Sequence, residues 1–238
     1  MHAIAKGFAQ KPGIDYTDTY VPVAHLESTR TILHISASLN WEIHQMDVKM
    51  AFLHGDLKEE VYMEQPEGMK ESGKESWVCY VRKTLYGLMQ AARAWNLCLH
   101  HTMLDIGYVC TMADHCIYMH KTLEGSSILT IHVDDICATA SSTTEMVKLK
   151  VQLGQFFNLV DLGELKWLLG ITITQNRPVH TISLCQGAYI ESITKCLHLE
   201  DAHPLATLLD PHVILLKDLS PTSNEEKLWM KKIPYLTA

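Results

Sequence analysis

The sequence Ile131-His132-Val133-Asp134-Asp135-Ile136 places two adjacent carboxylates inside an apolar run that extends from residue 128 to residue 138. Burying two like charges side by side costs several kcal/mol each unless a cation or a hydrogen-bond donor compensates. Because side chains alternate across a strand, we expect His132 and Asp134 on one face, Ile131 and Val133 in the core, and Asp135 at the bend. A divalent metal ion is the simplest compensation. Adjacent Asp residues are also common in solvated turns, so the spacing alone leaves both interpretations open.

A third carboxylate, Asp47, lies in similarly apolar company. Residues 41–53 are predicted to form a strand with Asp47 in its middle, and Gly55-Asp56 ends the run. If this strand lies beside the acidic pair, three carboxylates converge. Such a cluster suits two Mg²⁺ ions about 3.5–4 Å apart, an arrangement used for phosphoryl transfer. A solvated, metal-free Asp47 is the alternative.

Composition limits the remaining classes. The chain has 238 residues, 47% hydrophobic and 20% charged, with a formal net charge of −7. These values indicate a globular protein, and the negative charge argues against a strong nucleic-acid binder on electrostatics alone. The seven cysteines never form a Cys-x-x-Cys pair, so a zinc or redox protein is poorly supported. Without a signal peptide or a long apolar run, we expect a soluble intracellular protein with no membrane partner.

The periodicity predicts an α+β fold with an antiparallel sheet packed on helices. Helices are expected over 27–39, 85–104, 145–156 and 188–197, and strands over 61–63, 77–81, 116–119 and 128–139, with a later hairpin of 168–173 and 180–184. Gln90 and Arg93, three residues apart, would share a polar helix face. By default, that face would be solvated.

More specific information comes from several segments that occur in a fixed order. They include Ala5-Lys6-Gly7-Phe8-Ala9-Gln10-Lys11-Pro12-Gly13, Gln45-Met46-Asp47-Val48-Lys49-Met50-Ala51-Phe52-Leu53, Leu85-Tyr86-Gly87-Leu88-Met89-Gln90-Ala91 and His132-Val133-Asp134-Asp135. Together they resemble the reverse transcriptase domain of copia-type LTR retrotransposon Pol polyproteins. The resemblance extends from near residue 5 to residue 235.

The resemblance implies a polymerase right-hand palm with partial fingers. Asp47, Asp134 and Asp135 would be the catalytic metal ligands, with Mg²⁺ as the cofactor and Mn²⁺ as an alternative. Gln90 would contact the incoming nucleotide, with Arg93 nearby. The reaction would be RNA-directed DNA polymerisation, in which a primer 3′-hydroxyl attacks a dNTP, so the partners would be an RNA or DNA template-primer and dNTP. Residues 5–200 would form the reverse transcriptase domain with truncated fingers, palm and the start of a thumb or connection region. Residues 201–238 would form a poorly defined tail leading toward a missing RNase H region.

The chain also departs from the family pattern. Met89 stands where Lys is usual, Ala92 where Pro is usual and His132 where an aromatic residue is usual, and His2 replaces an Arg. The chain is expected to begin inside the fingers, so other Pol segments or self-association would have to complete it. Two hypotheses follow: a minimal polymerase with weak activity, or an inactive transposon-derived remnant with structural or weak nucleic-acid-binding character.

Overall fold

The computed structural model describes residues 4–199, 216–217 and 220–231. The chain divides into two compact units. The first comprises Met1–Lys166 and Thr174–Ser183, and the second comprises Trp167–Ile173 and Leu184–Ala238. The predicted domain boundary after residue 200 lies outside the described residues, as does most of the predicted tail, so both stay predictions.

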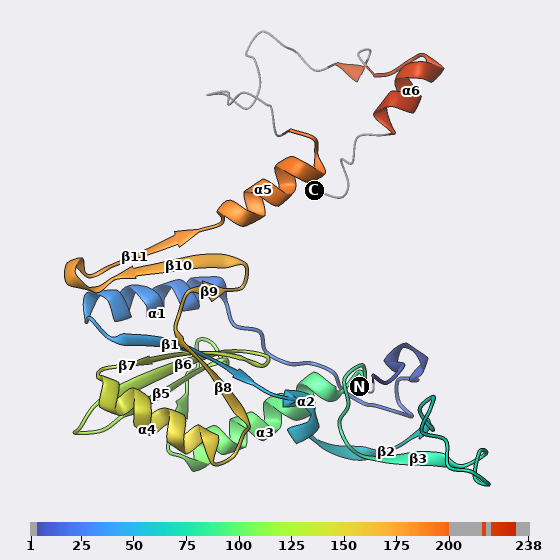
Figure 1. The fold of residues 1–238 in the computed structure, drawn as a ribbon, viewed down its shortest axis with the longest axis horizontal. Helices are drawn as coiled ribbons and strands as arrows, with labels where there is room; N and C mark the ends of the chain where they lie inside the picture. The colour runs from blue at the N-terminus through green and yellow to red at the C-terminus, as the bar shows by residue number, and fades with distance from the viewer. Residues whose placement is uncertain (1–3, 200–215, 218–219, 232–238) are drawn as a thin grey trace. The chain divides into compact units, whose positions relative to one another are not determined.

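A six-stranded antiparallel sheet forms the centre of the first unit (Figure 1). Its order is β4-β5-β6-β7-β1-β8, so β1 lies between β7 and β8 although it comes first in the chain. The bounds are β1 (Glu42–Val48), β4 (Val109–Cys110), β5 (Ile117–Lys121), β6 (Ser126–His132), β7 (Asp135–Ala140) and β8 (Leu159–Glu164). This order puts the chain around Asp47 directly beside the acidic pair.

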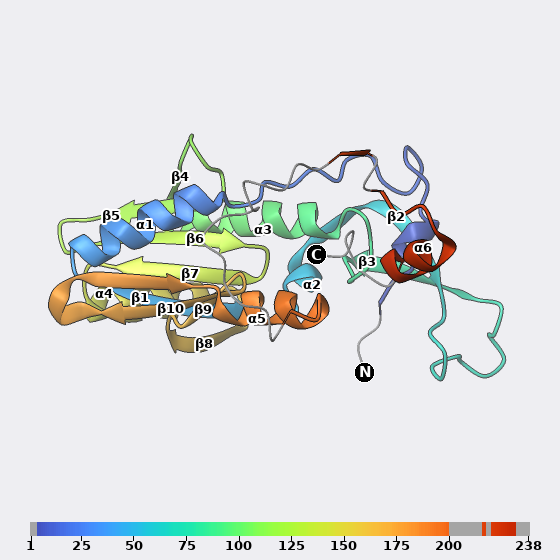
Figure 2. The same cartoon turned by 90° about the horizontal axis from the view of Figure 1, so that it is seen from above.

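Helices cover both faces of this sheet (Figures 1 and 2). Helices α3 (Ala91–Asp105) and α4 (Thr143–Gly154) supply Trp95, Leu99 and Leu153 to the main core, where they pack with inward-facing sheet residues such as Met46 and Ile136. On the other face, α1 (Leu26–Ser38) packs Ile32 against Ile117 and Ile128. The prediction of an α+β fold with an antiparallel sheet packed on helices is confirmed.

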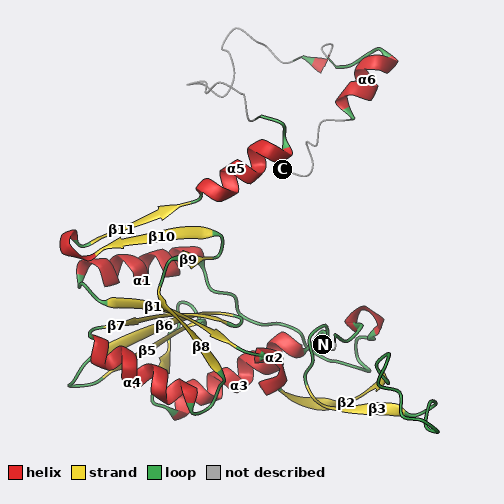
Figure 3. Ribbon diagram, in the orientation of Figure 1, coloured by secondary structure: helices red, strands yellow, loops and turns green. Residues whose placement is uncertain are grey.

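A second, two-stranded element stands at one end of the unit (Figure 3). The short helix α2 (Ala51–His54) leads into the antiparallel hairpin of β2 (Asp56–Glu64) and β3 (Val78–Lys83). Val61 and Val81 from this hairpin pack with Leu88 and Ala91 from the chain just before and at the start of α3. The 3₁₀ turn η1 (Gly7–Ala9) belongs to the chain segment that runs along this region.

The remaining elements follow β8. Strands β9 (Trp167–Leu168), β10 (Ile171–Asn176) and β11 (Thr181–Cys185) form a sheet in the order β11-β10-β9, with the 3₁₀ turn η2 (Arg177–Val179) after β10. Within the first unit, Arg177 donates to Glu42 Oε1 at 2.6 Å and thereby fixes this segment to the start of β1. The second unit also contains α5 (Gly187–Cys196) and α6 (Asn224–Met230), whose start is a Ser223/Glu226 capping box. None of the helices described here is long and apolar enough to cross a membrane.

Two sequence predictions need correction. The expected helix over 85–104 begins only at Ala91, because Gly87 has a φ of +94° that no helix accommodates. Gln90 therefore precedes the helix and is buried, not solvated on a helix face. The expected strand over 41–53 ends at Val48, since Met50 adopts a left-handed conformation and α2 follows.

Candidate active site

A two-residue turn joins β6 to β7, and the acidic pair comprises its second residue, Asp134, and the first residue of β7, Asp135. His132 pairs with Asp135, which leaves Val133 and Asp134 as the turn. The expectation that Val133 lies in the core and Asp135 at the bend is wrong: Val133 is 39% exposed, and Asp135 is the first residue of β7. Val133 has a φ of +59°, a region that is costly for a β-branched side chain. Strained backbone of this kind concentrates at functional sites.

Strand β1 brings the third carboxylate to this turn. Asp47 is the direct cross-strand partner of Asp135, and the Val48 amide donates to the Asp134 carbonyl at 3.0 Å. Met46, Val48 and Ile136 face the main core, so alternation puts Asp47 and Asp135 on the opposite face of the sheet. His132 shares that face because it pairs with Asp135. The fold thus places Asp47 opposite Asp135 and leaves Asp134 in the adjoining turn, and each of the three is half-buried.

The electrostatics of the site reflect this crowding. Burial raises the pKa of Asp47, and the neighbouring charges of Asp134 and Asp135 raise it further, while Lys49 acts in the other direction. Burial also raises the pKa of Tyr86, again with contributions from Asp134 and Asp47. The Asp47 carboxylate therefore lies in a negative field that a bound cation would relieve.

Two residues that the sequence argument did not assign also belong to this site. Gln45 donates its side-chain amide to Asp135 Oδ1 at 3.3 Å. Tyr86 lies within the field of the carboxylates, and its ring packs against Phe52 with centroids 4.6 Å apart. Gln45 lies two residues before Asp47, so strand alternation puts both side chains on the same face of β1 and could have identified Gln45 from the sequence. Tyr86 could be found only from the fold.

The donor set has the chemistry of a site for a hard divalent cation, since it offers carboxylate oxygens only. In the part of the chain that the structure describes, however, no three His, Cys, Asp or Glu side chains converge closely enough to hold a metal ion. Mg²⁺ commonly uses one or two protein carboxylates together with substrate phosphates. The three residues fit that open mode of binding better than a closed cage made of protein alone.

Gln90 and Arg93 lie in a different environment from the carboxylates. Gln90 accepts from Gln10 at 3.1 Å and donates to the Asp15 carbonyl at 3.0 Å. Arg93 donates to the Tyr20 carbonyl at 2.9 Å and pairs with Asp18 at 3.1 Å. Both side chains thus hold the N-terminal segment 10–20, and both line a pocket of about 490 Å³.

Three residues that depart from the family pattern lie near the candidate site. Met89 and Ala92 are neighbours of Gln90 and Arg93 in the sequence, and His132 is paired with Asp135. Met89 is 45% exposed, and its amide donates to Gln10. Ala92 is the second residue of α3. The buried Nδ1 atom of His132 has no hydrogen-bond partner among the described residues.

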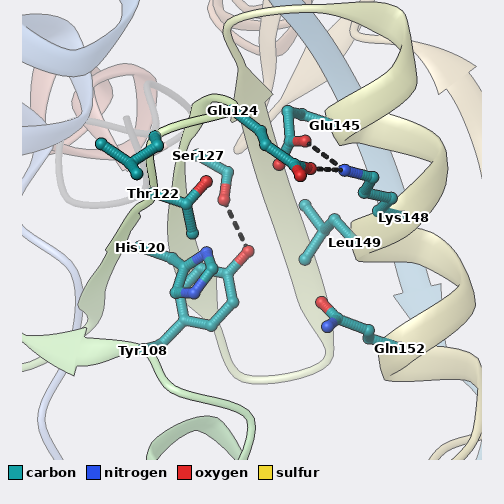
Figure 4. A pocket seen from close by; sticks show the side chains of 10 residues that line it. Tyr108, His120, Thr122, Glu124, Ser127, Glu145, Lys148, Leu149 and Gln152 are labelled. Atoms are coloured by element: carbon teal, nitrogen blue, oxygen red, sulfur yellow. Dashed lines mark hydrogen bonds and ion pairs between the residues drawn. The ribbon is translucent and has the colours of Figure 1, made fainter.

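Another hollow, of about 520 Å³, lies at the opposite end of β6 from the acidic turn (Figure 4). Five of its polar side chains already bind one another. Tyr108 and Ser127 share a hydrogen bond of 2.6 Å, and Lys148 lies 3.0 Å from Glu145 and 2.5 Å from Glu124. These pairings leave the acidic turn as the better candidate for chemistry.

Comparison with known proteins gives a consistent result. A family model described as reverse transcriptase (RNA-dependent DNA polymerase) matches residues 1–211. The chain is 42% identical over 99% of its length to the retrovirus-related Pol polyprotein from transposon TNT 1-94 of Nicotiana tabacum. It is 35% identical over 87% of its length to the retrovirus-related Pol polyprotein from transposon RE1 of Arabidopsis thaliana. The chain spans only 18% and 14% of these relatives. No solved structure gives a significant match.

Proposed function

The chain belongs to the reverse transcriptase (RNA-dependent DNA polymerase) family, as the corresponding domain of a copia-type retrotransposon Pol polyprotein. From that premise, we propose that it catalyses template-directed DNA synthesis at Asp47, Asp134 and Asp135. The observation that carries this proposal is the pairing of Asp47 with Asp135 beside the strained turn at Val133. Carboxylates so crowded are costly for stability and therefore call for a functional reason.

The three carboxylates would hold divalent cations, Mg²⁺ or Mn²⁺, together with the phosphates of a dNTP. Two bound cations would supply charge neutralisation to the attacking 3′-hydroxyl and to the leaving pyrophosphate. The chain's own part is positioning. Gln45 orients the carboxylate of Asp135, and the backbone bond from Val48 to Asp134 fixes the turn against β1. The preformed framework means that little reorganisation is needed when substrate arrives.

Gln90 and Arg93 would serve the nucleotide from the pocket that they line beside the N-terminal segment. Arg93 is the stronger candidate, because its guanidinium is a bidentate phosphate ligand held by a partly exposed ion pair. Gln90 already uses its amide oxygen with Gln10 and one N–H with the Asp15 carbonyl, so its contribution would be to shape the pocket. In this proposal, the central sheet serves as palm and the β2–β3 hairpin with the N-terminal segment serves as partial fingers.

A second function, that of an inactive remnant, is favoured by specific observations. Met89 puts an uncharged, exposed side chain where the family has a Lys, and the formal net charge of the chain is −7. Both features weaken attraction to a phosphate backbone. A domain of this kind would keep the fold and bind nucleic acid weakly.

Primer extension on an RNA template with dNTP and Mg²⁺ separates the two. The wild type is compared with the Asp134→Asn, Asp135→Asn double variant and with Glu164→Gln, which changes an exposed carboxylate on β8. Extension by the wild type and by Glu164→Gln, but not by the double variant, supports the polymerase. Absence of extension by all three folded proteins favours the remnant.

A further inference from the structure

Trp95 connects helix α3 to the acidic turn. Its side chain is 1% exposed, and its indole N–H donates to the Val133 carbonyl at 2.7 Å. A buried indole N–H needs an acceptor. Here the acceptor is the backbone carbonyl of Val133, the residue that immediately precedes the acidic pair. The bond thus links two segments 38 residues apart in the sequence.

The orientation of this indole ring is fixed by its surroundings. Phe157 packs edge-on against it with centroids 5.1 Å apart, and His54 lies at 5.9 Å. The helix can approach this closely because residue 55 is glycine: a Cβ at Gly55 would lie 2.9 Å from the backbone nitrogen of Trp95. The donor is therefore held by packing on several sides.

The acceptor, by contrast, is strained. Val133 adopts a φ of +59°, which its branched side chain disfavours and which persists only when neighbouring structure imposes it. Val133 is the first residue of the two-residue β6–β7 connection, a position where hairpin turns favour positive φ. Two bonds to backbone carbonyls then hold this turn, one from Trp95 to Val133 and one from Val48 to Asp134. The bond from Trp95 differs from the other constraints because it comes from a helix, whereas the ladder pair His132–Asp135 and the Val48 bond belong to the sheet itself.

We propose that Trp95 is a positioning residue for the acidic turn: its indole N–H holds the strained Val133 peptide and thereby sets the directions of the Asp134 and Asp135 side chains. This inference rests on the proposed polymerase function for its catalytic consequence. Its structural consequence, a rigid turn, is independent of activity.

Trp95→Phe tests the proposal because it removes the N–H and keeps an aromatic ring. Hydrogen exchange of the amides of residues 131–136 should become at least tenfold faster, while the exchange of α4 stays unchanged. The rise in melting temperature on adding Mg²⁺ should fall to less than half of the wild-type rise. In primer extension, kcat should fall at least tenfold, with the KM for dNTP changed less than twofold. Phe157→Leu is the matched control, since it loosens the ring packing but keeps the N–H donor.

A second substitution distinguishes positioning from general loss of structure. Gly tolerates positive φ without strain, so Val133→Gly added to Trp95→Phe should restore part of kcat and of the Mg²⁺ response. If Trp95→Phe fails to fold, benzothienylalanine at position 95 takes the place of this variant in every assay. This isostere of tryptophan keeps the ring volume but lacks the N–H.

The outcomes are separable. Unchanged exchange of residues 131–136 in the variant that lacks the N–H overturns the proposal, as does an equal effect in Phe157→Leu. An inactive wild type contradicts the proposed function alone, because the exchange measurement still decides whether Trp95 holds the turn.

Discussion

Asp47 and Asp135 are direct partners across β1 and β7, so two carboxylates occupy neighbouring positions on one face of the sheet. Like charges placed opposite each other destabilise an antiparallel pair. Both side chains also lie near Asp134, and burial together with these charges raises the pKa of Asp47. The candidate active site is therefore built at the expense of stability, as is common where function requires a strained arrangement.

Replacing Asp47 with Asn should consequently stabilise the metal-free protein. Removing one of two opposed charges is expected to gain about 0.2–1 kcal/mol, which corresponds to about 0.4–4 °C in melting temperature for a chain of this size. The same variant should lose the further stabilisation that Mg²⁺ gives the wild type. Thermal unfolding with EDTA and with Mg²⁺ measures both effects. A lower melting temperature in EDTA, or a full Mg²⁺ response, would contradict this account of the site.

Gly55 should be irreplaceable for a steric reason. A Cβ at this position would meet Thr84 Oγ1 at 2.7 Å and the backbone of Ala94 and Trp95 at 2.9 Å. Gly55→Ala therefore forces α3 away from the hairpin and should cost about 1–3 kcal/mol. Gly154→Ala is the control, because nothing lies within 4 Å of its Cβ position, and it should be neutral or stabilise by up to about 1 kcal/mol. Urea unfolding of both variants checks this; equal effects would contradict it.

Much of the fold could be predicted from the sequence because its elements are long and regularly patterned. The apolar pattern of β6, β7 and α4 reflects burial on the sheet and in the main core, and the strands predicted over 61–63 and 77–81 overlap β2 and β3. The strand pattern around Asp47 allowed it to lie beside the acidic pair, the family resemblance implied that it does, and the register of β1 with β7 pairs Asp47 with Asp135.

What the sequence could not reveal depends on conformations that side-chain patterning does not encode. Alternation predicted Val133 in the core, but the pairing of His132 with Asp135 makes it a turn residue with positive φ. The apolar periodicity over residues 85–104 predicted one helix. Gly87 has a positive φ, however, and the helix begins only at Ala91. The contact of Trp95 with Val133 depends on tertiary packing, so no local pattern could have indicated it.

Asp114 should control part of the acid stability of the protein. Its carboxylate is 3% exposed and accepts from the His25 amide at 2.9 Å and the Cys116 amide at 3.0 Å, which ties the start of α1 to β5. Burial alone would raise the pKa of Asp114, but these hydrogen bonds outweigh it and hold the pKa below its ordinary value of 3.8. A depressed folded pKa gives stability that is present above the unfolded pKa and is lost as pH falls through the folded pKa.

Asp114→Asn should accordingly destabilise the protein by about 1.5–3 kcal/mol at pH 7. The difference from wild type should shrink below about pH 4, where the Asp114 carboxylate of the unfolded chain takes up a proton before the folded one does. Urea unfolding at pH 7, 5 and 3.5 measures the trend, with Asp105→Asn as an exposed control. A difference that is constant across this range would show that the charge of Asp114 is not what stabilises the fold.

The ion pair between Arg93 and Asp18 offers a test of nucleotide binding that leaves stability nearly intact. Both side chains are partly exposed, at 36% and 53%, so the pair contributes at most about 1 kcal/mol to folding. If Arg93 has to leave Asp18 to reach a triphosphate, Asp18→Asn should lower the KM for dNTP by about two- to threefold, because it removes a competing carboxylate. Asp15→Asn is the matched control, since its carboxylate accepts from the Lys11 amide in the same segment. A raised KM in Asp18→Asn would instead mean that Asp18 holds Arg93 in its working position, and steady-state primer extension distinguishes the two.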